Sequence, residues 1–350
     1  MNDTSAPRVL RIGILGAAQI APNAICIPAA VLGHRLVVIG SRELSKAEAF
    51  KERWGVENAV QGYEAVVNHP DVDLVYNALP NSHHAFWNIA ALKAGKNVLS
   101  EKPFASNYEE AKRVADVAAI STGKIIEGFH YQYHPSIQRA IEIAHSGELG
   151  NILTVTSAFN TSPPPDSDIC WSLALAGGAM MDLGCYSLHI QRRLSLALFG
   201  EEPTLISALS REGRPGVDTF MEAKIAYKNG AVGTLSCSME STHFESTLRI
   251  VGSEGELFVP SFVQPGMDDS LVVTIGGTSR TERTTRISSY TWQLQAFAEQ
   301  IGGQRESVGV MEDALANAAF IDDIYRAAGM ATRPKRIHPA HIAEPSRLAL

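Results

Sequence analysis

The chain has 350 residues, of which 45% are hydrophobic and 19% charged, so it is long enough for two domains and is not disordered throughout. Its net charge of −7 offers no basic face for nucleic acid. Four scattered cysteines without a C-x-x-C pair predict neither a zinc site nor a disulfide framework. The first residues lack the order of a signal peptide, and no apolar run is long enough to cross a membrane. We therefore expect a cytoplasmic protein with no metal, nucleic-acid or membrane partner.

Short apolar runs alternate with amphipathic stretches over the first third of the chain. The runs are residues 10–15, 36–39, 74–79, 98–99 and 125–126. Helices are predicted between them, one from a capping box at 45–48, one at 84–94 that Gly95 terminates, and one from Asn107. Strand–helix alternation of this kind predicts a doubly wound parallel sheet, a Rossmann domain that we place at residues 1–128.

The pattern changes after a helix expected at about 135–145. Strand-like runs follow, at 152–158, 205–209, 220–227, 231–238, 247–251 and 271–275. The pair Asn229-Gly230 between two of these runs predicts a hairpin. With helices at about 291–302 and 310–328, residues 129–330 are expected to form an α+β domain with a mostly antiparallel sheet. Residues 331–350 contain three prolines and are predicted to run over the surface as an extended tail.

The first apolar run leads into a turn that predicts a dinucleotide site. Gly16, Ala18 and Ala21 occupy the positions of G-x-G-x-x-G/A, which allow a tight turn, close approach of a pyrophosphate and close packing of helix on strand. Unpaired N–H groups at the start of the following helix favour the phosphates. The other residues of the turn are Ala17, Gln19 and Ile20. Since alanine replaces the middle glycine, a tight turn that binds nothing stays the alternative.

The second apolar run ends at Ser41-Arg42, and Lys46 follows one helical turn later. A hydroxyl and a guanidinium suit the 2′-phosphate of NADP, whereas an NAD site usually has an acidic residue here to hold the ribose. We therefore predict NADP over NAD. Glu43 is the residue that could reverse this prediction, and a merely solvated Arg42 is the other alternative.

The tripeptide Glu101-Lys102-Pro103 closes a further apolar run. A lysine at the end of a buried strand must keep a charged partner or shift its pKa, and either state is useful for chemistry. The proline behind it disfavours the α region for Lys102 and so fixes the direction of its side chain. Taken alone, the three residues are more typical of a surface turn.

The segment 177–189 combines a glycine pair with three titratable side chains. If it is helical from Ala179, Asp182 and Tyr186 share a face and His189 lies close to it. Such groups on an otherwise apolar helix are costly unless they are paired or face a cavity. The alternative is a helix with one wet side.

Together these segments resemble the glucose–fructose oxidoreductase and inositol dehydrogenase family (Gfo/Idh/MocA), from residue 10 to about 330. The resemblance rests on residues 13–18, 79–84, 94–103 and 177–186. The branch to which the chain is most similar contains NADP-dependent aldose (xylose-type) and dihydrodiol dehydrogenases.

The resemblance implies a Rossmann domain, a second domain with a large open sheet, and a nicotinamide between them near Lys102. It implies that Glu101 and Lys102 line the cofactor site, that the lysine contacts the substrate hydroxyl, and that Pro103 is cis. It places Leu79, Pro80, Asn81 and His84 beside the nicotinamide, although His84 could be a capping or core histidine. The open sheet implies a homodimer or homotetramer.

Tyr186 matches the acid/base of aldose-type members. A nearby Lys102 ammonium would favour its phenolate and stabilise an alkoxide, while Asp182 would contact a substrate hydroxyl and His189 is a second-choice base. Tyr131 and Trp171 complete the expected substrate site. Trp171 ends a proline-rich loop that could instead be plain surface, and Gln132 stands where many members have arginine.

These residues predict an NADP-dependent enzyme that acts on CH–OH groups and transfers hydride to or from a sugar, polyol or keto-sugar. Three alternatives stay open at this stage. They are oxidation of a non-sugar diol, a hydrolase with tightly held NAD, and an NAD(P)-sensing protein without turnover.

Overall fold

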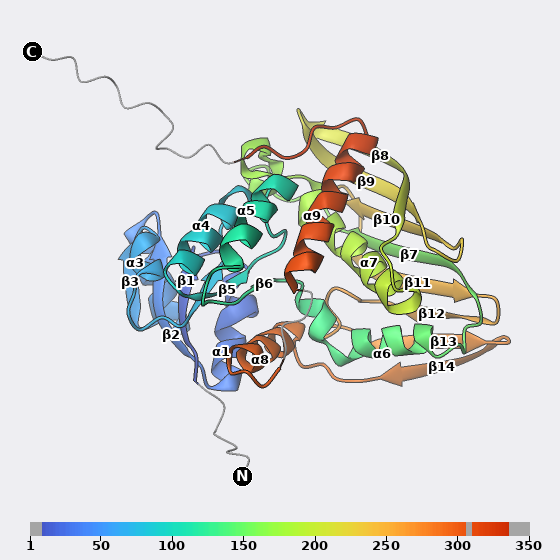
Figure 1. Cartoon of the computed structure of the whole chain (residues 1–350), viewed down its shortest axis with the longest axis horizontal. Helices are drawn as coiled ribbons and strands as arrows, with labels where there is room; N and C mark the ends of the chain where they lie inside the picture. The colour runs from blue at the N-terminus through green and yellow to red at the C-terminus, as the bar shows by residue number, and fades with distance from the viewer. Residues whose placement is uncertain (1–8, 306–309, 336–350) are drawn as a thin grey trace, which may run out of the picture.

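The computed structural model describes residues 9–305 and 310–335, which form two domains side by side (Figure 1). The first contains a six-stranded parallel sheet in the order β3-β2-β1-β4-β5-β6. Its strands are β1 (Arg11–Leu15), β2 (Arg35–Ser41), β3 (Asn58–Gln61), β4 (Leu74–Asn77), β5 (Asn97–Ser100) and β6 (Ile125–Glu127). This order is that of a dinucleotide-binding doubly wound sheet.

Helices cover both faces of this sheet because its strands are apolar on both sides. They are a π-turn η1 (Pro22–Cys26) continued by α1 (Ile27–Leu32), then α2 (Leu44–Trp54), α3 (Glu64–Val67), α4 (Asn81–Lys93) and α5 (Tyr108–Ala118). Two buried clusters result, one around Ile12 and Ile14 and the other around Val38 and Val75. The strand β3 and the short helix α3 were not predicted, because their sequences lack a clear apolar run.

The second domain contains an eight-stranded sheet in the order β14-β13-β12-β11-β7-β10-β9-β8. Its strands are β7 (Ile152–Asn160), β8 (Thr204–Arg214), β9 (Val217–Ala226), β10 (Val232–Ser238), β11 (Glu245–Gly252), β12 (Gly255–Val259), β13 (Ser270–Ile275) and β14 (Thr278–Arg283). All neighbours are antiparallel except β7 and β10, which are parallel. The predicted fold class is therefore confirmed.

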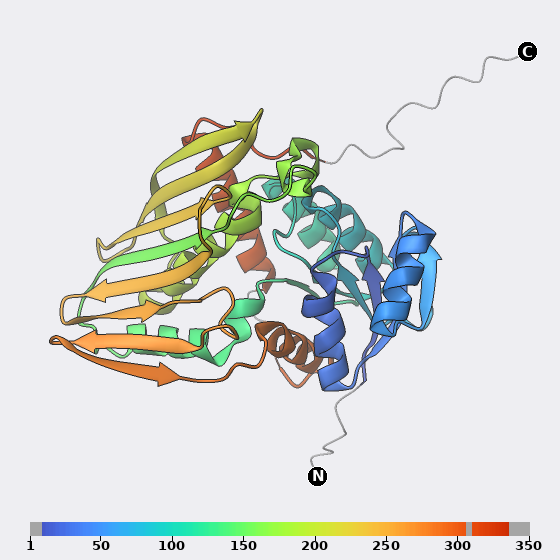
Figure 2. The same ribbon diagram turned by 180° about the vertical axis from the view of Figure 1, so that it is seen from behind.

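One face of this sheet carries the helices α6 (Pro135–His145), α7 (Cys185–Phe199) and α9 (Val310–Ala327) (Figures 1 and 2). The helix α8 (Ser289–Ile301) follows the sheet in sequence but packs against the first domain, where Leu294 and Phe297 join the cluster of Ile12 and Ile14. The chain thus returns to the first domain after building the second. The domain boundaries, 1–128 and 129–330, stay a prediction. They assign α8 to the second domain, whereas α8 packs against the first.

Several local predictions are confirmed. Gly95 ends α4 with a positive φ of 71°, and the side chain of Asn107 caps α5 by accepting from the N–H of Glu110. The predicted hairpin joins β9 to β10, with Gly230 at φ 84° and the side chain of Asn229 accepting from the N–H of Ala231.

Two local predictions are wrong. The capping box at 45–48 does not exist, because α2 begins at Leu44, the residue before it is Glu43, and no side chain caps it. The tail does not simply run over the surface, because the side chain of Arg333 is buried. Residues 336–350 of the predicted tail lie outside the described residues. Within the described part, no helix is long and apolar enough to cross a membrane.

Candidate active site

The predicted catalytic residues come from both domains and meet at the domain boundary. Lys102 follows β5, and its ammonium donates to the backbone carbonyl of Asp182 at 2.6 Å and reaches the Asp182 carboxylate at 3.4 Å. The same ammonium lies 5.1 Å from the ring centre of Tyr186. The Lys102-Pro103 peptide is cis, as the resemblance implied. The structure therefore brings Lys102, Asp182 and Tyr186 together.

The segment that carries Asp182 is a π-turn, η5 (Met180–Gly184), which continues into α7. Tyr186 is the second residue of α7, so the four residues from Asp182 to Tyr186 span a π-turn and not the regular α-helix that was expected. The Asp182 side chain is 45% exposed, whereas Tyr186 is 4% exposed. This difference gives the carboxylate access to water and leaves the phenol in an apolar site.

Aromatic side chains surround Tyr186. The rings of Phe129, His130 and Phe159 meet it edge-on at centre distances of 5.3, 5.8 and 5.7 Å. Burial raises the pKa of Tyr186 well above its ordinary value. The ammonium of Lys102 packs against the ring, so burial outweighs any stabilisation of the phenolate by Lys102 in this structure, and the acid/base role of Tyr186 stays a prediction. The phenol stays protonated.

Lys102 itself keeps its charge. Burial disfavours the ammonium, but Asp182 outweighs this effect together with Cys185 and Glu101, and the pKa of Lys102 is raised above its ordinary value. Glu101 accepts a hydrogen bond from the Tyr76 hydroxyl at 2.8 Å, and burial raises the pKa of this carboxyl. A fixed cation therefore lies next to a neutral phenol.

Leu79 lies in the loop after β4, and Asn81 and His84 lie in the first turn of α4, which follows that loop. The ring nitrogens of His84 lie 2.7 Å from the carbonyl oxygen of Pro103 and 2.6 Å from that of Leu79. Burial lowers the pKa of His84 to about 4, so the ring is neutral and donates to one of these oxygens at a time. The Asn81 side chain donates to the carbonyl of Ala176 at 3.0 Å, across the domain boundary. In this structure His84 braces the backbone beside Lys102, and Asn81 ties α4 to the segment before the glycine pair.

The turn after β1 fits a dinucleotide. Gly16 has a φ of 93°, and a Cβ there would lie 3.1 Å from the Leu79 side chain, so this turn needs glycine. Within the described chain, the backbone N–H groups of residues 17–20 make no hydrogen bond, which leaves them for phosphate oxygens. Ala21 is fully buried against β1, as close helix–strand packing requires.

The residues predicted to select the cofactor lie at the end of β2. Ser41 is buried, and Arg42 is exposed beside it. The ammonium of Lys46 pairs with Glu43 at 2.8 Å on the surface. Because Glu43 pairs with Lys46, its carboxylate is partly neutralised, and Arg42 forms no salt bridge with any other residue that the structure describes.

His189 and Tyr131 lie in a buried network behind Tyr186. The hydroxyl oxygen of Tyr131 lies 2.6 Å from Nδ1 of His189, and Nε2 of His189 lies 2.8 Å from the Asp313 carboxylate. Asp313 also pairs with Arg192 at 2.9 Å. Burial lowers the pKa of His189. Both ring nitrogens are thus occupied by protein atoms, and the network joins α7 to α9. A direct role in proton transfer or substrate binding stays a prediction for both residues.

Trp171 lies in a short 3-10 turn, η3 (Ile169–Trp171), with its indole N–H donating to the carbonyls of Pro164 and Pro165 at 3.3 and 3.1 Å. The Arg214 guanidinium lies 4.9 Å from its ring centre. The proline-rich loop therefore holds the indole in place, and one face of the ring is taken by a cation.

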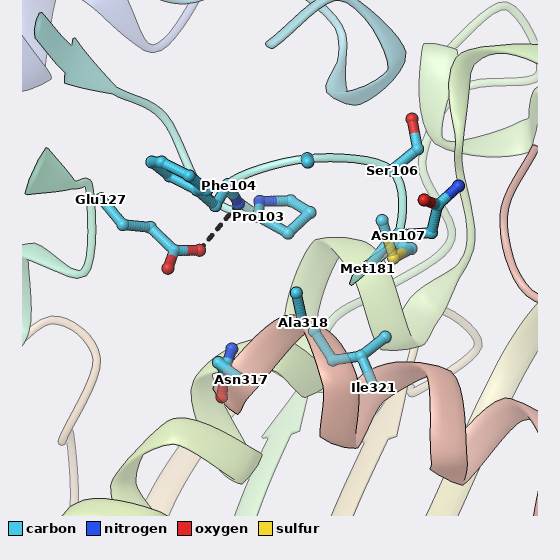
Figure 3. Close-up of a pocket in the computed structure, with 10 residues that line it drawn as sticks. Pro103, Phe104, Ser106, Asn107, Glu127, Met181, Asn317, Ala318 and Ile321 are labelled. Carbon is cyan, nitrogen blue, oxygen red and sulfur yellow. Dashed lines mark hydrogen bonds between the residues drawn. The ribbon is translucent and has the colours of Figure 1, made fainter. Parts of the chain in front are cut away.

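Two titratable groups near the site were not among the predicted site residues. Glu127 ends β6 and accepts a hydrogen bond from the N–H of Phe104 at 2.7 Å, beside a small cavity between the 103–107 loop and α9 (Figure 3). Burial raises its pKa to about 8. The pKa of His130 is lowered to about 3 by burial, and its ring bonds Ser289. An acidic residue directly after the apolar run 125–126 was the available signal for Glu127.

Comparison with known proteins identifies the family. The model of the oxidoreductase family with an NAD-binding Rossmann fold matches residues 10–129, and that of the GFO/IDH/MocA C-terminal domain matches residues 137–258. The chain therefore belongs to this family of oxidoreductases, as the sequence resemblance predicted. Among the described residues, no group of three or more His, Cys, Asp and Glu side chains could hold a metal ion.

Individual relatives cover almost the whole chain. A D-xylose 1-dehydrogenase (NADP(+)) from Haloferax volcanii is 32% identical over 91% of this chain and 97% of its own length. A solved 3-ketoreductase from Actinomadura kijaniata, in complex with NADP and TDP-benzene, is 26% identical with a TM-score of 0.83 and covers 91% of this chain and 98% of its own. A trans-1,2-dihydrobenzene-1,2-diol dehydrogenase from Bos taurus is 29% identical over 63% of this chain and 65% of its own length. The predicted enzyme class, a nicotinamide-dependent oxidoreductase, is confirmed.

Proposed function

We propose that the chain is an NADP-dependent oxidoreductase that transfers hydride between the nicotinamide and a hydroxyl or carbonyl carbon of a sugar-like substrate, and that its chemistry suits reduction of a keto group. The observation that carries the proposal is the pairing of a charged Lys102 with a protonated Tyr186 at the domain boundary. The xylose dehydrogenase and the 3-ketoreductase support the substrate class and the cofactor.

The cofactor supplies the hydride when it is bound. The N–H groups of residues 17–20 would hold its pyrophosphate, and Ser41 and Arg42 would hold the 2′-phosphate. Lys46 adds positive charge one turn further on, although Glu43 shares it. His84 fixes the backbone after Lys102, Asn81 fixes the segment that leads to the glycine pair, and both would shape the nicotinamide end of the site.

The protein then supplies charge and a proton. A carbonyl that accepts hydride becomes an alkoxide, and the fixed ammonium of Lys102 stabilises that charge as it develops. The Tyr186 hydroxyl donates the proton, because its raised pKa keeps it protonated at neutral pH. Asp182 orients Lys102 through its carbonyl and offers its exposed carboxylate to a substrate hydroxyl. The face of the Trp171 ring away from Arg214 would stack on the substrate ring.

The test is a panel of keto-sugars, aldoses, polyols and diols, incubated with NADPH, NADP, NADH or NAD while nicotinamide absorbance is followed. We expect consumption of NADPH with a keto-sugar. If the purified chain binds NADPH but consumes none with any carbonyl, and forms none with any alcohol, it is either a sensing protein or a hydrolase with tightly held NAD, and the proposal fails. A protein that oxidises only non-sugar diols would favour the second candidate, a dihydrodiol dehydrogenase, which the bovine relative supports.

We further infer that the chain works in the cytoplasm, where NADP is available, and that it forms a homodimer or homotetramer through the second sheet. Exposed apolar side chains on this sheet support self-association; they are Leu153, Ile206, Leu209 and Val232, between 38% and 55% exposed. Light scattering of the eluted protein tests this, and a monomer at micromolar concentration would contradict it.

A further inference from the structure

Arg333 follows α9 and is the one residue of the predicted surface tail whose side chain is described as buried, at 1% exposed. Its guanidinium forms an ion pair with Asp218 of β9, which is 0% exposed. It also donates to the carbonyls of Gly177 at 2.7 Å and Gly216 at 2.9 Å, and stacks over the Tyr325 ring at 4.1 Å. All three nitrogens of this guanidinium have a partner, but a buried arginine is costly to desolvate. Packing alone therefore does not explain its presence here.

Asp218 connects Arg333 to the turn that carries Asp182. Its second carboxylate oxygen accepts a hydrogen bond from the N–H of Met180, the first residue of η5, at 2.7 Å. Gly178 precedes that turn with a φ of 128°, and a Cβ there would lie 2.1 Å from Asp218 and 2.5 Å from Arg333. The second glycine of the pair is therefore required by the ion pair, which lies directly against the start of the catalytic turn.

The backbone of Arg333 contacts the other domain. Its carbonyl accepts a hydrogen bond from the side chain of Asn107 at 2.8 Å, and Asn107 caps α5 at the end of the loop that begins with Lys102. Arg333 thus holds the loop of Lys102 through its backbone carbonyl, and it holds the turn of Asp182 through its guanidinium. The 2.6 Å contact between Lys102 and the Asp182 carbonyl spans the same two segments.

We propose that Arg333 is a positioning residue for hydride transfer: it fixes the Asp182 turn relative to the Lys102 loop, and so sets where the ammonium stands beside Tyr186. This inference rests on the proposed function. Its physical basis is that the guanidinium donates in three directions from a planar fork, which a lysine ammonium of similar charge cannot reproduce. Displacement of a catalytic group by about 1 Å can cost about a hundredfold in rate.

The test compares Arg333→Lys with Arg326→Lys, a matched change at an exposed arginine of α9. We expect Arg333→Lys to lower kcat about tenfold or more while KM for NADPH stays within about twofold, because the phosphate turn is untouched. We also expect Lys102 to react faster with an amine-acylating reagent, read by peptide mass spectrometry, since its hold on the Asp182 carbonyl is loosened. Arg326→Lys should change neither measurement.

A second variant separates positioning from stability. Arg333→Met combined with Asp218→Asn removes both charges, so no unpaired charge is left buried and much of the stability returns. If Arg333 only stabilises the fold, this double variant regains kcat and the protection of Lys102 along with its melting temperature, and the proposal is overturned. Unchanged kcat and labelling in Arg333→Lys would also overturn it. If the wild-type chain turns over no substrate, the proposed function fails, whereas the labelling comparison still decides whether Arg333 positions Lys102.

Discussion

The ammonium of Lys102 is bonded to the backbone carbonyl of Asp182, 2.6 Å away, and not to the hydroxyl of Tyr186. The contact joins the end of a Rossmann strand to a π-turn of the second domain. A backbone oxygen cannot lose its acceptor role by mutation or by protonation, so the position of the cation depends on the path of that turn. The charge of Lys102 and the proposed proton donor, Tyr186, are therefore two separate groups that do not bond each other.

Replacement of Lys102 tests the charge. Lys102→Met removes the ammonium and keeps the length of the side chain, and we expect kcat to fall by about a hundredfold or more because the alkoxide loses its stabilising cation. Lys102→Arg keeps the charge but not its compact shape, and should retain more activity than the methionine variant. Steady-state kinetics with NADPH measure both. Equal turnover in the wild type and Lys102→Met would contradict the role.

Replacement of Tyr186 tests the proton. Tyr186→Phe keeps every ring contact with Phe129 and Phe159 and removes only the hydroxyl, so kcat for reduction should fall by about a hundredfold or more with the fold intact. Because burial raises the pKa of Tyr186, the wild-type rate of reduction should not decline as pH approaches the ordinary phenol value of about 10. A decline that is present in the wild type and absent in Tyr186→Phe would show that the phenol ionises earlier.

The side chain of Asp182 is expected to matter less than its backbone. Its carboxylate is 3.4 Å from the Lys102 ammonium and 45% exposed, so solvent screens the attraction. Asp182→Asn keeps the carbonyl contact and should lower kcat by less than about tenfold, while KM for a polyhydroxylated substrate rises. If the loss in kcat equals that of Lys102→Met, the carboxylate takes part in the chemistry.

The sequence predicted both sheets because the strand periods and the glycine turns are local signals. It also brought Lys102, Asp182 and Tyr186 to one site through the family resemblance. The π-turn was beyond prediction, because one extra residue in a helical turn leaves no trace in the spacing of apolar residues. Asp182 and Tyr186 were expected four residues apart on a regular helix, and both contact Lys102 although a π-turn lies between them.

Ion pairs between residues far apart in the sequence were also not predicted. Arg192 and Asp313 lie more than a hundred residues apart, and Arg333 pairs with Asp218 across a similar separation. Nothing in the residues next to Arg333 indicates a buried guanidinium, and the proline that follows it is typical of a surface segment. The raised pKa of Tyr186 was also not predicted, because it depends on how the side chains around Tyr186 and Lys102 pack in the folded chain.

Arg42 is expected to select NADP. Arg42→Ala removes the exposed cation at the end of β2, and we expect the affinity for NADPH to fall by about tenfold or more while the affinity for NADH changes little, because only NADPH carries the 2′-phosphate. Fluorescence titration measures both constants. Arg53→Ala, on the exposed face of the same region, is the charge-matched control. A ratio of affinities that is unchanged by Arg42→Ala would assign the selectivity elsewhere.

Glu127 is expected to make stability fall as pH rises. Burial raises its pKa from 4.5 to about 8 in the folded chain. At pH values between these two, the folded protein holds a proton that the unfolded chain has released, so the free energy of unfolding decreases as pH rises through this range and is level on either side of it. Glu127→Gln removes the titration, and its amide oxygen can still accept from the N–H of Phe104.

The melting temperature of Glu127→Gln, measured relative to that of the wild type, should therefore increase by about 3 °C or more between about pH 5 and pH 8.5. Calorimetry at these two pH values measures the difference. Glu52→Gln, at an exposed site on α2, is the control and should show no such trend. A constant difference between wild type and Glu127→Gln would mean that water or a nearby cation keeps Glu127 ionised in the folded protein, in spite of its burial against the 103–107 loop (Figure 3).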